Sequence, residues 1–413
     1  MNKPELLIPA GDFNTLKIAY YYGADACYIG GNYFSLRAKA INFDDFELKK
    51  AVEYAHSINK KIYITANIFA MNSDLDKINK YFDYLNEIKP DGVLISDLGV
   101  FRIAKRIFQN VDIHISTHAN TTNLETVLFY RDLGVKRVVL ARELSLKDIE
   151  YIKNYVKDSI EIETFIHGSM CISYSGRCLL SSFLTSKSSN QGECTHPCRW
   201  KYKIIDKEFE FVEEMRPNEK FSIVENEKGS YIFNSKDLCM IEHIDDLLDI
   251  SIDSLKVEGR MKSELYIATI TRTYRKAIDD YYHNKKTYYD NIKNYLLEIK
   301  KCTYREYTTG FFYGSPNNTA QVYDENTYIE GAKLCGIVYD TDEEFCYFFQ
   351  KNKFSVGDNL EVMDKDFKNR NVKVLKMFDA DTNEEIESCP HSKQNLKVKF
   401  DKKIDIGSVI RKL

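Results

Sequence analysis

Short apolar runs alternate with amphipathic stretches along residues 6–260 of the chain. The intervening stretches, such as NLETVLFYRDLG and SLKDIEYIKNYV, repeat apolar residues every three or four positions, as helices do. This alternation is typical of βα units around a parallel sheet. The predicted strands are residues 6–11, 26–31, 61–67, 92–97, 113–120, 137–143, 160–168 and 254–260. They predict an α/β fold, a TIM-type (β/α)8-like barrel whose chemistry lies at the carboxyl ends of its strands.

The pattern changes after the last predicted strand. Residues 263–286 predict one long helix, and residues 286–319 are charged and rich in tyrosine, as in a connector. From residue 320 onward, short β runs are separated by turn residues, which predicts a small β-barrel. We therefore predict a barrel domain at residues 1–285 with a cysteine-rich segment at 163–240, a helical connector at 286–319 and an all-β domain at 320–413.

Composition narrows the class of protein. Hydrophobic residues make up 44% of the chain and charged residues 29%, which indicates an ordered globular protein. No apolar stretch is long enough to span a membrane, so we expect a cytoplasmic protein with no membrane partner. The net charge of −4 gives no general basic field, so any nucleic-acid binding must use a local patch.

The chain has ten cysteines, and a reducing cytoplasm disfavours disulfides between them. Metal binding or ordinary burial must therefore account for them. Five are scattered singly among apolar residues, where a small buried side chain is the simplest interpretation, and we assign them no function. These are Cys27, Cys302, Cys335, Cys346 and Cys389.

Four other cysteines lie in one run, with six, fifteen and three residues between them: Cys171, Cys178, Cys194 and Cys198. Cys239 follows in NSKDLC. Thiolates select zinc, copper(I) or iron–sulfur clusters. Structural zinc usually uses two close cysteine pairs, and only Cys194 and Cys198 form one. The irregular spacing favours an iron–sulfur cluster held by separate loops, with zinc or no metal as the alternatives.

Several sequence runs, including those that contain the cysteines, resemble a known protein family. The runs ETFIHGSMCISYSGRCLLS, NQGECTHPCRWKY, NSKDLC and LKVEGRMKS closely resemble the collagenase-like U32 peptidase family, as does PAGDFNTLKIAYYYGADACYIGG near the start. Length and the C-terminal β module resemble the tRNA-hydroxylating branch of that family. The resemblance implies oxygen-independent, prephenate-dependent 5-hydroxylation of the wobble uridine of tRNA. It also implies a [4Fe–4S] cluster, with Cys171, Cys178 and Cys194 as ligands and Cys239 as the fourth, or Cys198 in its place.

The implied partners are tRNA and prephenate, with a protein electron donor as one candidate source of electrons. Arginines pair bidentately with carboxylates, so Arg142 and Arg177 are candidates for binding prephenate. Trp200, in a basic and aromatic run, is the candidate for stacking on RNA. The candidate catalytic residues are His167, Glu163, Glu258 and Arg260. We expect Glu163 and Glu258 to point to the same end of the barrel, although ion pairs within the fold would equally explain the charged candidates.

Two other functions stay open at this point. The family name implies a peptidase, but the chain has neither an HExxH zinc motif nor a GxSxG elbow. A zinc-stabilised RNA-binding protein without catalysis is the second alternative. Asn67, Asp97, His118 and Asn120 also end predicted strands and are weaker candidates for the site.

Overall fold

The computed structural model divides the chain into two compact units. It describes residues 3–36, 42–171, 173–200, 210–212, 220–222, 225–226, 229–230, 235–314, 320 and 328–413. The barrel unit comprises Met1–Leu16, Asp25–Met261 and Arg305–Thr327, and the C-terminal unit comprises Lys17–Ala24, Lys262–Tyr304 and Tyr328–Leu413. Each unit is described below by itself.

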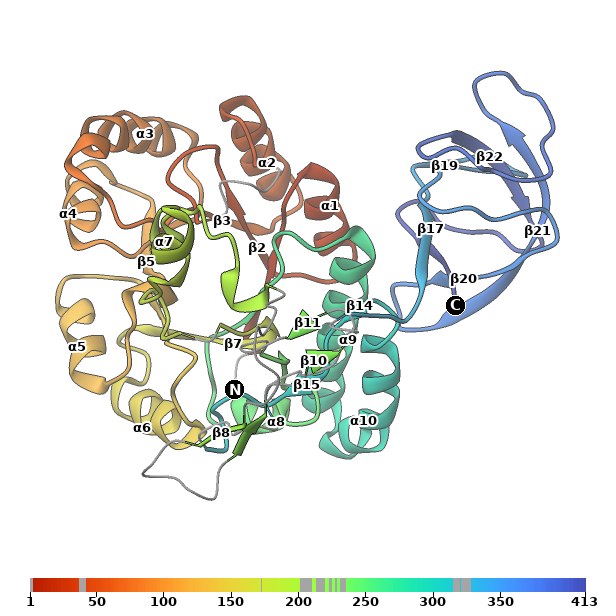
Figure 1. Ribbon diagram of the computed structural model, residues 1–413. Coiled ribbons are helices and arrows are strands. Elements are labelled where there is room, and N and C mark those ends of the chain that lie inside the picture. Colours follow the sequence, from red (N-terminus) through yellow and green to blue (C-terminus); the bar gives the residue numbers. More distant parts are fainter. Residues whose placement is uncertain are drawn as a thin grey trace. The chain divides into compact units, whose positions relative to one another are not determined.

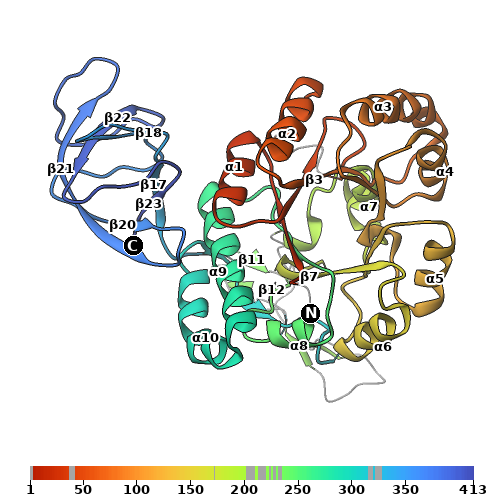
Figure 2. The same ribbon diagram turned by 180° about the vertical axis from the view of Figure 1, so that it is seen from behind.

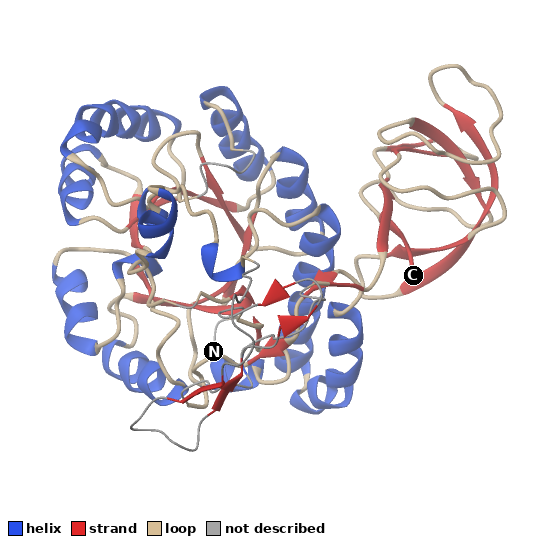
Figure 3. Ribbon diagram, in the orientation of Figure 1, coloured by secondary structure: helices blue, strands red, loops and turns tan. Residues whose placement is uncertain are grey.

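Eight parallel strands close into a barrel. Their order is β13-β1-β2-β3-β4-β5-β6-β7, and β13 also pairs with β7, which closes the ring. The predicted TIM-type barrel is thus confirmed, strand for strand (Figures 1 and 3). The strands are β1 (Glu5–Pro9), β2 (Ala26–Gly30), β3 (Lys61–Ala66), β4 (Gly92–Ile95), β5 (Asp112–Ile115), β6 (Arg137–Val139), β7 (Glu161–Ser169) and β13 (Ser254–Val257).

Helices alternate with these strands along the chain and lie outside the ring, as the reverse view also shows (Figure 2). Side chains cap several of them: Asp12 accepts from the amide of Thr15, and Asp97 accepts from the amide of Val100. The helices are α1 (Phe13–Tyr21), α2 (Asp45–Ser57), α3 (Leu75–Ile88), α4 (Leu98–Ile107), α5 (Leu124–Asp132), α6 (Leu146–Val156) and α8 (Ile244–Asp249), with short 3-10 turns at Asn72–Asp74 and Thr117–Ala119.

The cysteine-rich segment leaves the carboxyl end of β7. It contains the helix α7 (Leu180–Thr185), the 3-10 turns Ser189–Gln191 and Pro197–Arg199, and the short strands β8 (Glu210–Val212), β9 (Lys220–Ser222), β10 (Glu225–Asn226) and β11 (Gly229–Ser230). It ends in β12 (Asp237–Cys239), which pairs antiparallel with β7 and parallel with β15 (Tyr307–Thr308). The sequence KYKIID at residues 201–206 also predicts a β run, and it lies outside the described residues.

The C-terminal unit contains two helices and a curved antiparallel sheet. The helices are α9 (Glu264–His283) and α10 (Lys285–Ile299), and β14 (Thr303–Tyr304) pairs with β16 (Ile329–Glu330). The predicted all-β region forms a seven-stranded sheet around buried apolar residues such as Phe348, Val362 and Met377. Its order is β17 (Lys333–Ile337), β23 (Val409–Lys412), β20 (Asn359–Met363), β21 (Asn369–Asp379), β22 (Asn395–Phe400), β19 (Cys346–Phe349) and β18 (Asp340–Thr341).

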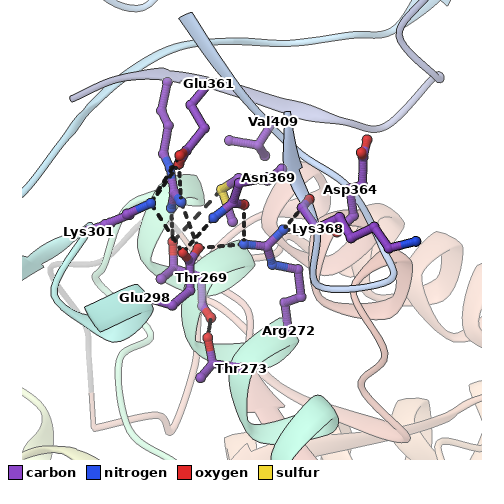
Figure 4. Close-up of polar contacts among 12 residues, drawn as sticks. Thr269, Arg272, Thr273, Glu298, Lys301, Glu361, Asp364, Lys368, Asn369 and Val409 are labelled. Carbon is purple, nitrogen blue, oxygen red and sulfur yellow. Dashed lines mark hydrogen bonds and ion pairs between the residues drawn. The ribbon is translucent and has the colours of Figure 1, made fainter. Parts of the chain in front are cut away.

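The predicted domain boundary at residue 285 differs from the division in the structure, which groups α9 with the C-terminal sheet. A buried network of charges explains this grouping (Figure 4). Arg272 of α9 and Arg411 of β23 both pair with Glu298 of α10, and Arg411 also pairs with Glu361 of β20. The amide of Asn369 donates to Glu298 at 2.8 Å. One carboxylate thus links both helices to the sheet.

This network predicts a response to acid. Burial alone would raise the pKa of Glu298, but the charges of Arg411 and Arg272 and the hydrogen bond from Asn369 lower it to about 2. The ionised carboxylate therefore stabilises the fold above pH 4.5, the ordinary value, and this contribution is lost as the pH falls toward 2. The loss is on the order of 3 kcal/mol, measurable by urea unfolding of the whole chain at a series of pH values.

The variant Glu298→Gln should remove this part of the pH dependence. At neutral pH it should also lower the free energy of unfolding by about 3–5 kcal/mol, because buried Arg272 loses its carboxylate partner and Arg411 retains only Glu361. The exposed Glu384→Gln is the matched control and should behave as the wild type. An unchanged acid response in Glu298→Gln would contradict this role.

Candidate functional site: a cysteine-lined cavity

One cavity of about 350 Å3 lies where three neighbouring barrel strands end. Thr117 and His118 follow β5, Arg142 and Glu143 follow β6, and Ser169 ends β7. The remaining wall comes from the cysteine-rich segment and from Phe311. The cavity therefore occupies the carboxyl end of the barrel, the place where barrels of this type carry their chemistry.

Four cysteines border this cavity: Cys171, Cys178, Cys194 and Cys198. Cys171 comes two residues after β7, Cys178 precedes α7, and the other two flank the start of the turn Pro197–Arg199. None of these four cysteines forms a disulfide within the described part of the chain. The structure thus brings together the three firmest predicted ligands and the alternative fourth.

Cys239, the preferred fourth ligand, is not among the residues that line the cavity. It is buried on β12 and is paired with His167 of β7, two positions before the end of that strand. It therefore lies beside the strand from which the other cysteines emerge. The choice between Cys198 and Cys239 remains a prediction to be tested.

The loop between Cys171 and Cys178 is fixed to the strand ends. The carboxylate of Glu143 accepts hydrogen bonds from the amide of Ser175 at 2.7 Å and from its hydroxyl at 3.2 Å. Gly176 has a φ of +74°, and a Cβ at this position would lie 2.1 Å from the carbonyl oxygen of His118. Only glycine allows both this conformation and this approach. These contacts hold Ser175 and Gly176 against the strand ends.

Hydrogen bonds also fix the second half of the cysteine-rich segment. The hydroxyl of Ser189 donates to the carbonyl of Cys178 at 2.6 Å, and the amide of Phe69, after β3, donates to the carbonyl of Asn190 at 3.0 Å. The hydroxyl of Ser181 accepts from the amide of Thr195 at 3.1 Å. These bonds connect the loops that carry Cys178 and Cys194.

A single metal ion and an iron–sulfur cluster make different demands on a set of thiol ligands. A single zinc needs all its thiolate sulfurs about 2.3 Å from one point. Among the residues that the structure describes, no three His, Cys, Asp or Glu side chains gather closely enough to hold one metal ion. A cluster binds each cysteine through a different iron, so its ligands can border a wider cavity. Four thiols around a cavity of about 350 Å3 suit that arrangement.

Arg142 is the arginine placed in the cavity wall. Its Nη1 donates to the carbonyl of Ser169 at 2.8 Å, its guanidinium lies 4.0 Å from the centre of the Phe165 ring, and its Nη2 is 3.8 Å from a carboxylate oxygen of Glu258. Within the described part of the chain its buried Nε has no hydrogen-bond partner. Arg142 therefore keeps donor capacity for an anionic ligand.

Glu163, a predicted catalytic residue, does not line the cavity. It is the third residue of β7, in the barrel interior near the beginnings of the strands, and so does not share the carboxyl end with Glu258 as expected. Lys256 donates to it at 2.7 Å and Arg137 at 3.0 Å. Burial would raise the pKa of Glu163, but these two cations lower it. Its contacts are those of a structural ion pair.

Two further predicted residues are buried near the carboxyl end but outside the cavity wall. Arg260 donates to the hydroxyl of Thr65 at 3.0 Å and to the side chain of Asn42 at 3.1 Å. The ring of His167 lies 5.5 Å from that of Tyr307. Glu258 reaches the site through Arg142, and Tyr28 donates to it at 3.3 Å.

The predicted RNA and substrate contacts Arg177 and Trp200 are exposed and do not line the cavity. The indole Nε1 of Trp200 donates to the carbonyl of Thr195 at 2.9 Å. Sequence reasoning overlooked Glu143 and Tyr174, which do line it, and ranked His118 low. Glu143 directly follows Arg142 at a predicted strand end, which was the available signal.

Comparison with known proteins identifies the family. Residues 11–322 match the model of peptidase family U32, and residues 330–411 match the U32 C-terminal domain. The chain belongs to the U32 family.

Several relatives carry a functional name. The chain is 38% identical over 412 residues to tRNA hydroxylation protein P1 of Bacillus subtilis, covering 99% of this chain and 95% of that one. It is 36% identical over 398 residues to tRNA hydroxylation protein P of Escherichia coli, covering 88% and 86%. It is 32% identical over 275 residues to the 23S rRNA 5-hydroxycytidine C2501 synthase of Escherichia coli, covering 67% of this chain and 39% of that one.

No helix in the described part of the chain combines the length and apolar character needed to cross a membrane.

The anchoring by Glu143 gives a testable expectation. In Glu143→Ala the amide of Ser175 loses a charged acceptor, a bond worth about 1.5–3 kcal/mol. Hydrogen exchange of residues 171–178, measured by mass spectrometry, should become on the order of ten- to a hundredfold faster. Glu150→Ala, an exposed position on α6, is the control. Unchanged exchange in this loop would show that Glu143 does not hold it.

Proposed function

We propose that this protein hydroxylates C5 of the wobble uridine of tRNA without molecular oxygen, with prephenate as cosubstrate and an iron–sulfur cluster as cofactor. The observation that carries the proposal is the cavity at the carboxyl end of the barrel, bordered by four cysteines and an arginine. The relatives named for tRNA hydroxylation and for 5-hydroxycytidine synthesis support the class of reaction and the RNA substrate.

Each part of the proposal uses particular residues. Cys171, Cys178 and Cys194 would hold the cluster, with Cys239 or Cys198 as the fourth ligand. Converting C–H to C–OH removes two electrons from the base, so these electrons must pass to an acceptor, for which we propose a partner protein. When bound, the cluster would relay them one at a time. A protein electron-transfer partner is part of the proposal.

Arg142 is the proposed anchor for prephenate. Prephenate carries two carboxylates, and a guanidinium pairs with such groups through charge-assisted hydrogen bonds. The stacking of Arg142 on Phe165 and its bond to Ser169 fix the plane of the guanidinium. Glu258, 3.8 Å from Nη2, would tune the charge that Arg142 presents to the ligand. Arg177 is exposed and lies outside the cavity wall, so the proposed prephenate anchor is Arg142 alone.

Variants of the cysteines test the proposal. Cys171→Ala, Cys178→Ala and Cys194→Ala should each lose iron, inorganic sulfide and visible absorbance after anaerobic purification, because each removes one cluster ligand. Transfer RNA from cells that carry only these variants should lack 5-hydroxyuridine by nucleoside mass spectrometry. Cys27→Ala, at a buried position of β2, should retain both. Equal losses in all four variants would indicate misfolding and contradict the assignment.

A second pair of variants identifies the fourth cluster ligand. Either Cys198→Ala or Cys239→Ala should lose the cluster, and the other should retain it. Retention in both would show that neither Cys198 nor Cys239 is the fourth ligand and would contradict this assignment. Wild-type protein that contains zinc and no sulfide would favour the zinc-stabilised RNA-binding alternative, and cleavage of a peptide in the absence of RNA would favour the peptidase.

A further inference from the structure

Tyr174 combines exposure with a place in the cavity wall. Its side chain is 62% exposed, yet it borders the cavity together with Cys171 and Cys178. A single exposed ring is common on protein surfaces and means little by itself. An aromatic ring at the edge of a cavity large enough for a small molecule is more informative, because it can contact a ligand that binds there.

The backbone that directly follows Tyr174 is held by several contacts. The amide of the next residue, Ser175, donates to Glu143, and Gly176 approaches the carbonyl of His118 in a conformation that favours glycine. The amide of Arg177 donates back to the carbonyl of Tyr174 at 2.9 Å, which closes a turn. A ring on such a backbone loses little conformational entropy when a ligand stacks on it.

The proposed reaction requires a base in this cavity. An enzyme that modifies a base must take it out of the stack, and it commonly replaces the lost stacking with an aromatic side chain. Arg177 belongs to the same turn and is exposed, so its cation can meet the phosphate of the extruded nucleotide. A planar pyrimidine followed by a phosphate matches the pair of Tyr174 and Arg177.

We propose that Tyr174 is the stacking platform for the pyrimidine that enters the cavity, and that it is a substrate-binding residue of the site. This inference rests on the proposed function, since it assumes an RNA substrate. It assigns to Tyr174 the contact with the target base itself, whereas Trp200 lies outside the cavity wall.

A double-mutant cycle between protein and RNA tests the assignment. The probes are a tRNA anticodon stem-loop with uridine at the wobble position and the same RNA with an abasic nucleotide there. Tyr174→Ala should weaken binding of the uridine RNA about 5- to 150-fold, the range for loss of one base–aromatic stack. It should bind the abasic RNA as the wild type does, because that RNA has no base to stack. Tyr174→Phe should retain wild-type binding of both.

Tyr151→Ala provides the matched control, because Tyr151 is 64% exposed on α6 and lies outside the cavity wall. It should bind both RNAs as the wild type does. If Tyr174→Ala weakens the abasic and uridine RNAs equally, Tyr174 contacts something other than the target base, and the inference is overturned. The same holds if the variant loses its cluster absorbance, since Tyr174 would then act on the cysteines.

The wild-type protein shows whether the proposed function or only the role of Tyr174 is wrong. Wild-type protein that forms no 5-hydroxyuridine and binds neither RNA would overturn the proposed function, and this inference with it. Wild-type protein that hydroxylates tRNA while Tyr174→Ala binds the uridine RNA unchanged would overturn the inference alone.

Discussion

The close contact between the cysteine-bearing loop and the ends of strands β5 and β6 is the constraint on which the site depends. Gly176 lies against the carbonyl of His118, and Glu143 binds both polar groups of Ser175. These contacts come from residues that directly follow barrel strands, so they fix Ser175 and Gly176, and with them the loop that precedes Cys178. The same contacts set the position of Tyr174 at the edge of the cavity.

Each of the two units contains a buried glutamate whose carboxylate is paired with two cations. In the barrel, Glu163 is held by Lys256 and Arg137, and in the C-terminal unit Glu298 is held by Arg272 and Arg411. A buried carboxylate is costly unless several cations and hydrogen bonds satisfy it, and both clusters meet that condition. The cluster around Glu163 does not line the cavity of the barrel, and Arg142 is the arginine in the described part of the cavity wall.

Much of the fold could be predicted from sequence, because buried parallel strands produce continuous apolar runs with clear turn signals. The grouping of α9 with the C-terminal sheet could not, since Arg272 and Arg411 meet Glu298 across long separations in sequence. The cysteines were found from their spacing. The role of Glu143 depends on Ser175, 32 residues away, and the position of Glu163 depends on where along β7 its carboxylate points. Such facts belong to tertiary structure alone.

The central claim is that separate loops bring cysteine thiols to one cavity in order to hold a cluster of iron and sulfide. Chemical analysis and Mössbauer spectroscopy of the anaerobically purified, iron-57-labelled protein test it most directly. The account predicts about four irons and four sulfides per chain with the spectrum of a cubane cluster. One zinc per chain, or iron without inorganic sulfide, would contradict it.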